Sequence, residues 1–276
     1  MITEPTSPPS GLASPSCSLS SLLDSVILGD NCETLAAMPV GSVDLVVTSP
    51  PYDDLRTYGG HLWDFYGVAW LLKRVLKPGG VIVWNVADAT KDGSETGTSM
   101  RQAIHFQTLG LNLHDTMIYQ TSKPPMNDRR YQAAWEYMFV FSLGNPKTWN
   151  PIKQPTRHAG ESVGGTYWNA DGSMKARHGK NPVAAESVRE NVWRMVERPG
   201  NGHPAPFPHA LASDHIQSWS NPGDVVLDPF AGSGTTLKAA KELGRRFVGI
   251  EINPEYVEIC QRRIAQDVLN LFPENA

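Results

Sequence analysis

The chain has 276 residues, of which 40% are hydrophobic and 19% charged, and its formal net charge is −4. A chain of this length can bury a sizeable core, and its composition excludes wholesale disorder. Its apolar runs are strand-sized, far shorter than the ~20 residues of a membrane helix. The first residues contain neither a basic segment nor a hydrophobic stretch, so we do not expect them to act as a secretory signal. Three cysteines without CxxC spacing (Cys17, Cys32 and Cys260) argue against a disulfide framework and a zinc site. We therefore expect a cytoplasmic protein with no membrane association and no metal.

Short apolar runs alternate along the chain with segments of helical spacing. Residues 1–24, rich in serine and proline, are expected to form a disordered tail. Predicted strands cover residues 26–28, 43–47, 81–86, 115–121, 136–142, 225–227 and 246–252, and predicted helices cover 32–38, 62–76, 100–109, 208–219, 235–243 and 254–271. This order predicts an open, mostly parallel, doubly wound α/β sheet.

A basic segment interrupts this alternation. Residues 143–181 contain six Lys/Arg and two Asp/Glu, together with Trp149, Tyr167 and Trp168, and show almost no apolar periodicity. We expect residues 143–190 to form an insertion outside the sheet. It separates one half of the domain at residues 25–142 from the other half at 191–276.

A glycine-rich loop with the sequence DPFAGSGTT, residues 228–236, follows one predicted strand and opens a helix. Doubly wound folds bind nucleotides at such positions, but no lysine follows Gly234 as a phosphate loop requires. Asp228 would repel a pyrophosphate and suits a cationic or zwitterionic ligand. Glu251 ends the next predicted strand, where a carboxylate can accept hydrogen bonds from ribose hydroxyls. Each feature alone has a structural explanation, a tight turn or a solvated carboxylate, whereas the pair indicates an adenosine cofactor without phosphates.

A second motif, residues 48–52 with the sequence TSPPY, also directly follows a predicted strand. Two prolines remove two N–H donors and stiffen the chain, so the loop presents carbonyl oxygens beside a hydroxyl and an aromatic ring. Ser49 and the Pro50 carbonyl can accept the two N–H bonds of a planar amine, and Tyr52 can stack on its ring. A plain turn would use such prolines too.

These motifs resemble those of the amino-group DNA methyltransferases, which methylate cytosine N4 or adenine N6 with S-adenosyl-L-methionine. Residues 49–52 and 228–236 match the family's catalytic and cofactor motifs, and residues 28–30 (LGD) and 203–208 (HPAPFP) match two further ones. The catalytic motif precedes the insertion and the cofactor motif follows it, which is the permuted order of the family's beta group. The resemblance implies a Rossmann-like S-adenosylmethionine-dependent methyltransferase fold with a target-recognition insertion.

The resemblance also implies a set of site residues. The catalytic residues would be Ser49, Pro50, Pro51 and Tyr52. The cofactor would be bound by Asp30, His203, Pro204, Phe207, Asp228, Phe230, Gly232, Gly234, Thr235 and Glu251, with Glu251 on the ribose, Asp30 near the adenine and residues 203–208 near the methionine end. Taken alone, Asp30 would serve equally well as a helix N-cap.

The target amine of such an enzyme lies inside double-stranded DNA, so the nucleotide must be flipped out at a cost of a few kcal/mol. Long basic side chains contact phosphates and help to grip the duplex. The candidates are Lys123, Arg129, Arg130, Lys147, Lys153, Arg157, Lys175, Arg177 and Lys180. For any single one of them a solvated basic loop is the better explanation, whereas the segment as a whole is interpreted as the target-recognition region.

The resemblance favours cytosine N4 as the methylated atom. The tetrapeptide SPPY and the following residues 55–59 are typical of cytosine-N4 members, whereas adenine-N6 members more often begin the tetrapeptide with Asp or Asn. Cytosine C5 transfer would need a cysteine nucleophile in a setting that no cysteine here occupies. Adenine N6 is the alternative, and a silent DNA-binding protein or an RNA methyltransferase agrees less well with the motifs and their order. The sequence leaves open a homodimer and a cognate restriction endonuclease.

Overall fold

A computed structural model of the chain describes residues 17–51, 63–121, 131–162, 165–177, 182–195 and 208–266. The chain divides into two compact units, of which the first comprises residues 1–150 and 191–276 and the second residues 151–190. None of the helices in the described ranges combines the length and apolar character needed to cross a bilayer.

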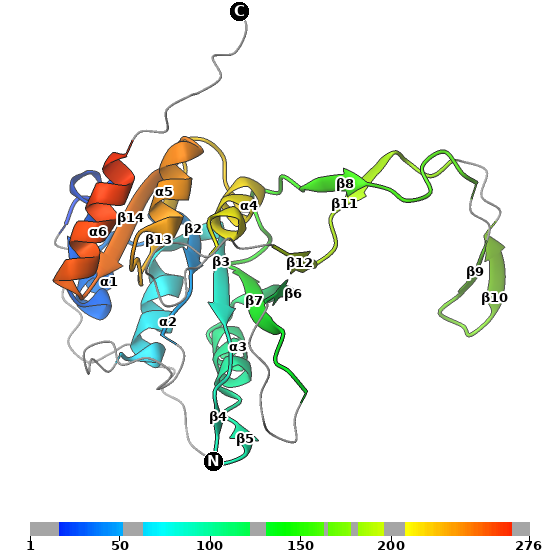
Figure 1. Cartoon of the computed structure of the whole chain (residues 1–276), viewed down its shortest axis with the longest axis horizontal. Coiled ribbons are helices and arrows are strands. Elements are labelled where there is room, and N and C mark those ends of the chain that lie inside the picture. Colours follow the sequence, from blue (N-terminus) through cyan, green and yellow to red (C-terminus); the bar gives the residue numbers. More distant parts are fainter. Residues whose placement is uncertain are drawn as a thin grey trace, which may run out of the picture. The chain divides into compact units, whose positions relative to one another are not determined.

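A mostly parallel sheet forms the centre of the first unit (Figure 1). Within the described residues it has eight strands in the order β1-β14-β13-β2-β3-β7-β6-β12. The strands are β1 Ser25–Leu28, β2 Val43–Thr48, β3 Leu76–Val86, β6 Asn112–Gln120, β7 Trp135–Ser142, β12 Val192–Arg194, β13 Val225–Asp228 and β14 Arg246–Glu251. β7 runs antiparallel to both of its neighbours, and the other pairs are parallel. The predicted sheet is thereby confirmed.

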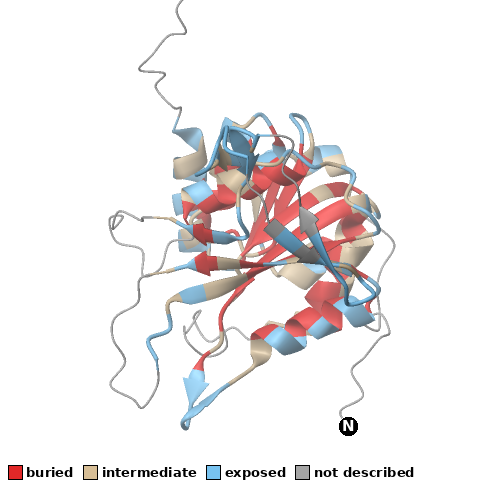
Figure 2. Cartoon of the chain, turned by 90° about the vertical axis from the view of Figure 1, so that its right-hand side faces the viewer, coloured by how far each residue is buried: buried red, intermediate tan, exposed pale blue. Residues whose placement is uncertain are grey.

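Helices cover both faces of the sheet. They are α1 Asn31–Ala37, α2 Phe65–Val75, α3 Thr98–Thr108, α4 His209–Trp219, α5 Thr235–Glu242 and α6 Pro254–Ala265. Residues of α1, α2 and α3 share one apolar cluster with Val46 and Ile82. The adjacent strand residues point to the opposite face because side chains alternate along a strand, and α4 packs there against β2 and α5. Figure 2 shows the resulting buried layer through the middle of the unit.

The strand order reverses between the neighbouring strands β13 and β2, from which the chain proceeds toward opposite sides of the sheet. From β2 it continues through α2 to β3 on one side, and from β13 through α5 to β14 on the other. The carboxyl ends of two such strands enclose the crevice in which open α/β sheets bind their ligands. Both predicted motifs, at residues 49–52 and 228–236, follow these two strands directly.

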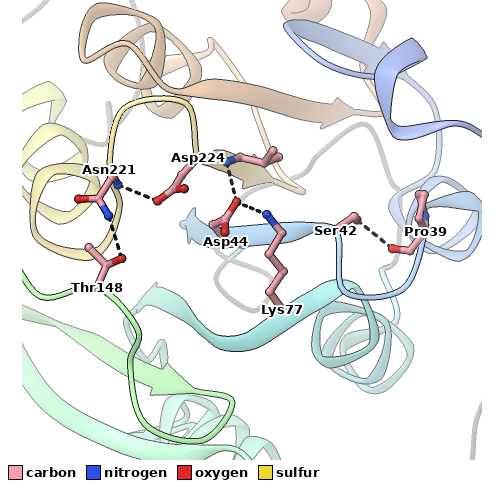
Figure 3. A network of polar contacts seen from close by, with 8 residues as sticks. Pro39, Ser42, Asp44, Lys77, Thr148, Asn221 and Asp224 are labelled. Carbon is pink, nitrogen blue, oxygen red and sulfur yellow. Dashed lines mark hydrogen bonds and ion pairs between the residues drawn. The ribbon is translucent and has the colours of Figure 1, made fainter.

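A polar network holds the opposite, amino-terminal edge of the same strands together (Figure 3). One carboxylate oxygen of Asp44 on β2 accepts hydrogen bonds from Lys77 Nζ at 2.6 Å and from the Val225 N–H at 2.9 Å. The bonds join β3 and β13 to the strand between them. Close by, the Asn221 amide donates to Thr148 Oγ1 at 3.2 Å.

The structure differs from the sequence-based prediction in two places near the ends of elements. Residues 17–24 were expected to belong to a disordered tail, but Leu19–Ser21 form a 3₁₀ turn, and Leu19, Leu22 and Leu23 pack on the core. Arg246 Nε also binds Asp24 at 2.6 Å, which fixes this segment to β14. The strand expected at residue 81 begins at Leu76, because Gly79 and Gly80 exchange backbone hydrogen bonds with Leu143 at the end of β7.

The second unit, residues 151–190, consists of short antiparallel hairpins in its described part. Strands β8 Lys153–Pro155 and β11 Glu186–Val188 pair with each other, as do β9 Gly165–Trp168 and β10 Met174–Arg177. The sequence analysis placed the start of the insertion at residue 143. Residues 143–150 instead belong to the first unit, because the Trp149 ring lies 4.6 Å from that of Trp219 and the Asn150 N–H donates to Ser218 O.

Candidate functional site

A buried hydrogen bond joins the two motifs. Thr48, the last residue of β2, donates from Oγ1 to Asp228 Oδ1 at 2.7 Å. In addition, Thr236 at the start of α5 donates from its hydroxyl to the Val47 carbonyl at 3.2 Å. The ends of β2 and β13 are therefore held together, with half-buried Ser49 and buried Pro50 immediately beyond Thr48. Tyr52 lies outside the described residues.

Asp228 is a carboxylate with almost no solvent contact. The residue is 4% exposed, and burial raises the pKa of its side chain to about 6, with the Glu251 charge adding to the effect. Hydrogen bonds from the Thr48 hydroxyl and the Phe230 N–H, the latter at 3.1 Å, work in the opposite direction because they favour the charged form. A cationic ligand at the end of β13 would relieve the cost of this buried charge.

The glycine turn contains two glycines in the left-handed region of backbone conformation. Gly232 and Gly234 have φ angles of +50° and +81°, a region that side chains with a Cβ rarely adopt. A Cβ on Gly234 would lie 2.4 Å from Cys260 Sγ, so α6 packs directly against the turn. Arg263 of α6 donates to the hydroxyls of Ser233 and Thr235 at 3.1 and 3.0 Å. The Thr235 side chain is thus held by α6.

Glu251 lies at the end of β14, beside the glycine turn. Its carboxylate accepts from the Gly232 N–H and the Asn253 N–H, both at 2.8 Å. A carboxylate has about four acceptor positions, so these two bonds orient the group and leave it able to accept ribose hydroxyls as well.

Asp30 follows β1, whose last residue Leu28 pairs with Glu251. The Asp30 side chain accepts a hydrogen bond from the Glu33 N–H at 3.0 Å and therefore caps α1, the structural role considered in the sequence analysis. Strands β1, β14, β13 and β2 are consecutive in the sheet. Asp228 and Glu251 end their strands, and Asp30 and Ser49 lie just beyond theirs, so all four lie along one stretch of the sheet edge.

Sequence reasoning assigned no role to several side chains around these residues. The Phe230 ring makes an edge contact with Trp63, the ring centroids lying 4.9 Å apart. Cys260 and Arg263 also contact the glycine-rich motif, and Thr48 and Thr236, one in each motif, connect the two motif-bearing strands. Thr48 could have been found from the sequence, because a buried aspartate requires donors and its neighbouring strand offers a hydroxyl. Nothing in the sequence marks Trp63.

Other predicted site residues have no described geometry. His203, Pro204 and Phe207 lie outside the described residues, as do Lys123, Arg129, Arg130 and Lys180, and nothing is described of the Arg177 side chain. Lys147 is exposed in the first unit, and Lys153, Arg157 and Lys175 are exposed in the second.

Comparison with known proteins identifies the family. Residues 43–262 match the family model for N6/N4 DNA methylases. The chain belongs to this DNA methylase family. The match spans both motifs and the segment between them, so the amino-group DNA methyltransferase resemblance is confirmed.

Individual relatives agree with this membership. The chain is 45% identical over 240 residues to the orphan methyltransferase M.BamHII of Bacillus amyloliquefaciens, covering 83% of this chain and 91% of the relative. A DNA modification methylase of Thermus thermophilus, solved in complex with S-adenosyl-L-methionine, is 27% identical with a TM-score of 0.59, covering 87% and 94% of the two chains. The cytosine-N4-specific PvuII DNA methyltransferase has a TM-score of 0.64 at 24% identity, covering 88% and 86%, which shows a shared fold.

Proposed function

We propose that this DNA methylase transfers a methyl group from S-adenosyl-L-methionine to N4 of a cytosine flipped out of duplex DNA. The observation that carries the proposal is the hydrogen bond between Thr48 and Asp228, 2.7 Å long, which brings together the ends of the two motif-bearing strands. A base amine held by the first motif and a cofactor held by the second would share one crevice. The family's description and the name of the Thermus thermophilus relative support DNA as the substrate.

The residues at this edge fit S-adenosyl-L-methionine in three ways. Asp228 offers a buried anion to a ligand that carries positive charge, and Glu251 offers oriented acceptors to a ribose. At Gly232, Phe230 O is the only atom of the described residues within 4 Å of where a Cβ would lie, so this part of the chain leaves room for a ligand to approach the backbone. When bound, the cofactor supplies an electrophilic methyl group on its sulfonium. We assign Asp30 to the adenine side and residues 203–208 to the methionine side, as the family motifs suggest.

The work of the first motif is to orient the amine. An aromatic exocyclic amine is a poor nucleophile because its lone pair is delocalised into the ring. Ser49 and the Pro50 carbonyl would hold both amino protons and favour an sp³ nitrogen whose lone pair faces the methyl group. Such catalysis depends on positioning and fixed dipoles. Pro51 would stiffen the loop, and stacking on Tyr52, worth ~1–3 kcal/mol per base, would offset part of the cost of flipping.

Two cysteines are poorly suited to the covalent chemistry of C5 methylation. Burial raises the pKa of the Cys260 thiol to about 12, and burial together with Asp30 and Asp64 raises that of Cys32 to about 12. Both thiols are therefore protonated at neutral pH, whereas a nucleophilic cysteine must be a thiolate. These two thiols therefore give no support to C5 methylation, and the serine at position 49 supports cytosine N4 over adenine N6.

The second unit would grip the DNA and recognise its sequence. Lys153, Arg157 and Lys175 are exposed there, and Trp168, which is 70% exposed, pairs across the β9–β10 hairpin with Met174. Basic side chains of this kind contact phosphates, and an exposed indole can stack on a base. In the first unit, Lys147 and the basic residues at 123–130 are further candidates for phosphate contacts.

The test is transfer of labelled methyl from S-adenosyl-L-methionine to duplex DNA, followed by digestion to nucleosides. We expect label in N4-methylcytosine, and methylome sequencing of an expressing host would give the sequence context. Label in N6-methyladenine alone would show that the target is adenine N6 and not cytosine N4, while methyl transfer to DNA would still be supported. Label on RNA but not on DNA, or binding without transfer, would contradict the proposal.

A further inference from the structure

The contact between Thr48 and Asp228 has a role beyond joining two strands. Thr48 is fully buried, Asp228 is 4% exposed, and the hydroxyl donates to the carboxylate at 2.7 Å. An ionised carboxylate removed from water is stable only when donors replace the water it has lost. Which groups supply those donors therefore decides whether Asp228 is charged when the cofactor arrives.

We propose that Thr48 is a positioning residue that keeps Asp228 ionised and so ready to bind the cofactor. The proposal rests on the proposed function, in which Asp228 faces S-adenosyl-L-methionine. A hydrogen bond from the Thr236 hydroxyl also lowers the pKa of Asp228, although by less than the bond from Thr48. However, a hydroxyl has one proton, and Thr236 directs its proton to the Val47 carbonyl. The proton of Thr48 is the side-chain proton committed to Asp228.

The charged and titratable groups around Asp228 do not replace this donor. From β14, Glu251 raises the pKa of Asp228 through its negative charge. From α6, Cys260 has a thiol whose pKa burial raises to about 12, so it stays neutral, and Arg263 is hydrogen-bonded to Ser233 and Thr235. Near α1 and α2, the charged groups are Asp30 and Asp64, whose negative charges raise the pKa of Cys32. Carboxylates accept hydrogen bonds, so neither can serve as a donor in place of Thr48. Beyond these groups, the Phe230 N–H is a backbone donor that no side-chain substitution removes.

The experiment measures the affinity for S-adenosyl-L-methionine by calorimetry between pH 5.5 and 9 for the wild type and Thr48→Val. The quantity compared is the ratio of the wild-type affinity to the variant affinity at each pH. Titration of the cofactor itself affects both affinities equally and cancels in this ratio. In the wild type, affinity falls as the pH drops below about 6, where Asp228 takes up a proton. Without the Thr48 donor the proton is taken up at higher pH, because a hydrogen bond to a charged group favours that group's ionised form. We expect Thr48→Val to bind about tenfold more weakly at pH 7, and the ratio to return toward one by pH 9.

Three further variants complete the design. Thr48→Ser keeps the hydroxyl and should bind like the wild type at every pH, whereas Thr48→Ala removes the donor without the bulk of valine and should match Thr48→Val. Ser142→Ala removes a buried hydroxyl at the opposite edge of the sheet, where Ser142 Oγ donates to Gly144 O at 2.7 Å, and should leave the ratio at one.

The outcomes separate the two proposals. A ratio for Thr48→Val and Thr48→Ala that is constant with pH would show a merely structural role and overturn the inference, as would a ratio of one throughout. Asp228→Asn should bind weakly at all pH values. Normal binding by Asp228→Asn would instead overturn the proposed cofactor site itself. Weak binding by Asp228→Asn with no effect at Thr48 would refute only the role of Thr48.

Discussion

Asp228→Asn should stabilise the protein without cofactor while it removes the response to cofactor. Burial raises the pKa of Asp228 from the ordinary 3.8 to about 6. At about 1.4 kcal/mol per pKa unit, keeping this group ionised in the folded state costs about 3 kcal/mol. The sign follows because the pKa of the folded state lies above that of the unfolded state. The cost is absent below pH 3.8, grows as the pH rises to about 6, and is fully present above it.

Asparagine removes the charge of Asp228 but keeps a side-chain oxygen that can accept hydrogen bonds from the Thr48 hydroxyl and the Phe230 N–H. We expect the free energy of unfolding of the variant to exceed that of the wild type by up to about 3 kcal/mol at pH 8, with the difference shrinking toward pH 4. S-adenosyl-L-methionine at about 100 times its dissociation constant should then stabilise the wild type by about 2.7 kcal/mol and leave the variant unchanged.

The assay is urea unfolding followed by tryptophan fluorescence at pH 4, 6 and 8, with and without cofactor. Asp44→Asn is a matched control at the other edge of the sheet, where the carboxylate is paired with Lys77 at 2.6 Å. Loss of this ion pair in Asp44→Asn should lower the free energy of unfolding at pH 8 by about 1 kcal/mol or less. The reasoning is refuted if Asp228→Asn is the less stable protein at pH 8, or if its advantage is the same at pH 4.

Three further substitutions test other parts of the site. Tyr52→Ala should reduce single-turnover methyl transfer about tenfold or more through lost stacking, with cofactor affinity kept; equal loss of both in parallel assays would remove the stacking role. Ser49→Ala should slow the chemical step while DNA affinity in gel shifts stays close to that of the wild type, and an unchanged rate would contradict its hydrogen bond to the amine. Gly234→Ala should cost about 1–3 kcal/mol in chemical denaturation because of its positive φ and the Cys260 contact, part of which Cys260→Ala should restore.

The order of strands and helices around the site was predictable because each strand has a short apolar run and each helix a periodic one. Residues 225–227 and 43–47 were assigned as strands from these local patterns, and both end in the motifs that carry the chemistry. Parallel strands place their carboxyl ends at one edge. The convergence of Asp228 and Ser49 was therefore a consequence of fold class.

Contacts between distant segments were not predictable in the same way. The segment around the turn at residues 19–21 is ordered because Leu19 packs on the core and because Asp24 binds Arg246, a partner more than two hundred residues away. Trp149 joins the first unit by packing on Trp219, although its sequence neighbours are basic and polar. Local composition cannot report such partners, because the stabilising contact lies in another part of the chain.

The most direct test of the central claim is a crystal structure of the protein with S-adenosyl-L-homocysteine. The account predicts the ribose hydroxyls on the Glu251 carboxylate and the sulfur atom between Asp228 and Ser49, facing the end of β2. A ligand bound elsewhere, or one whose sulfur faces away from Ser49, would contradict it.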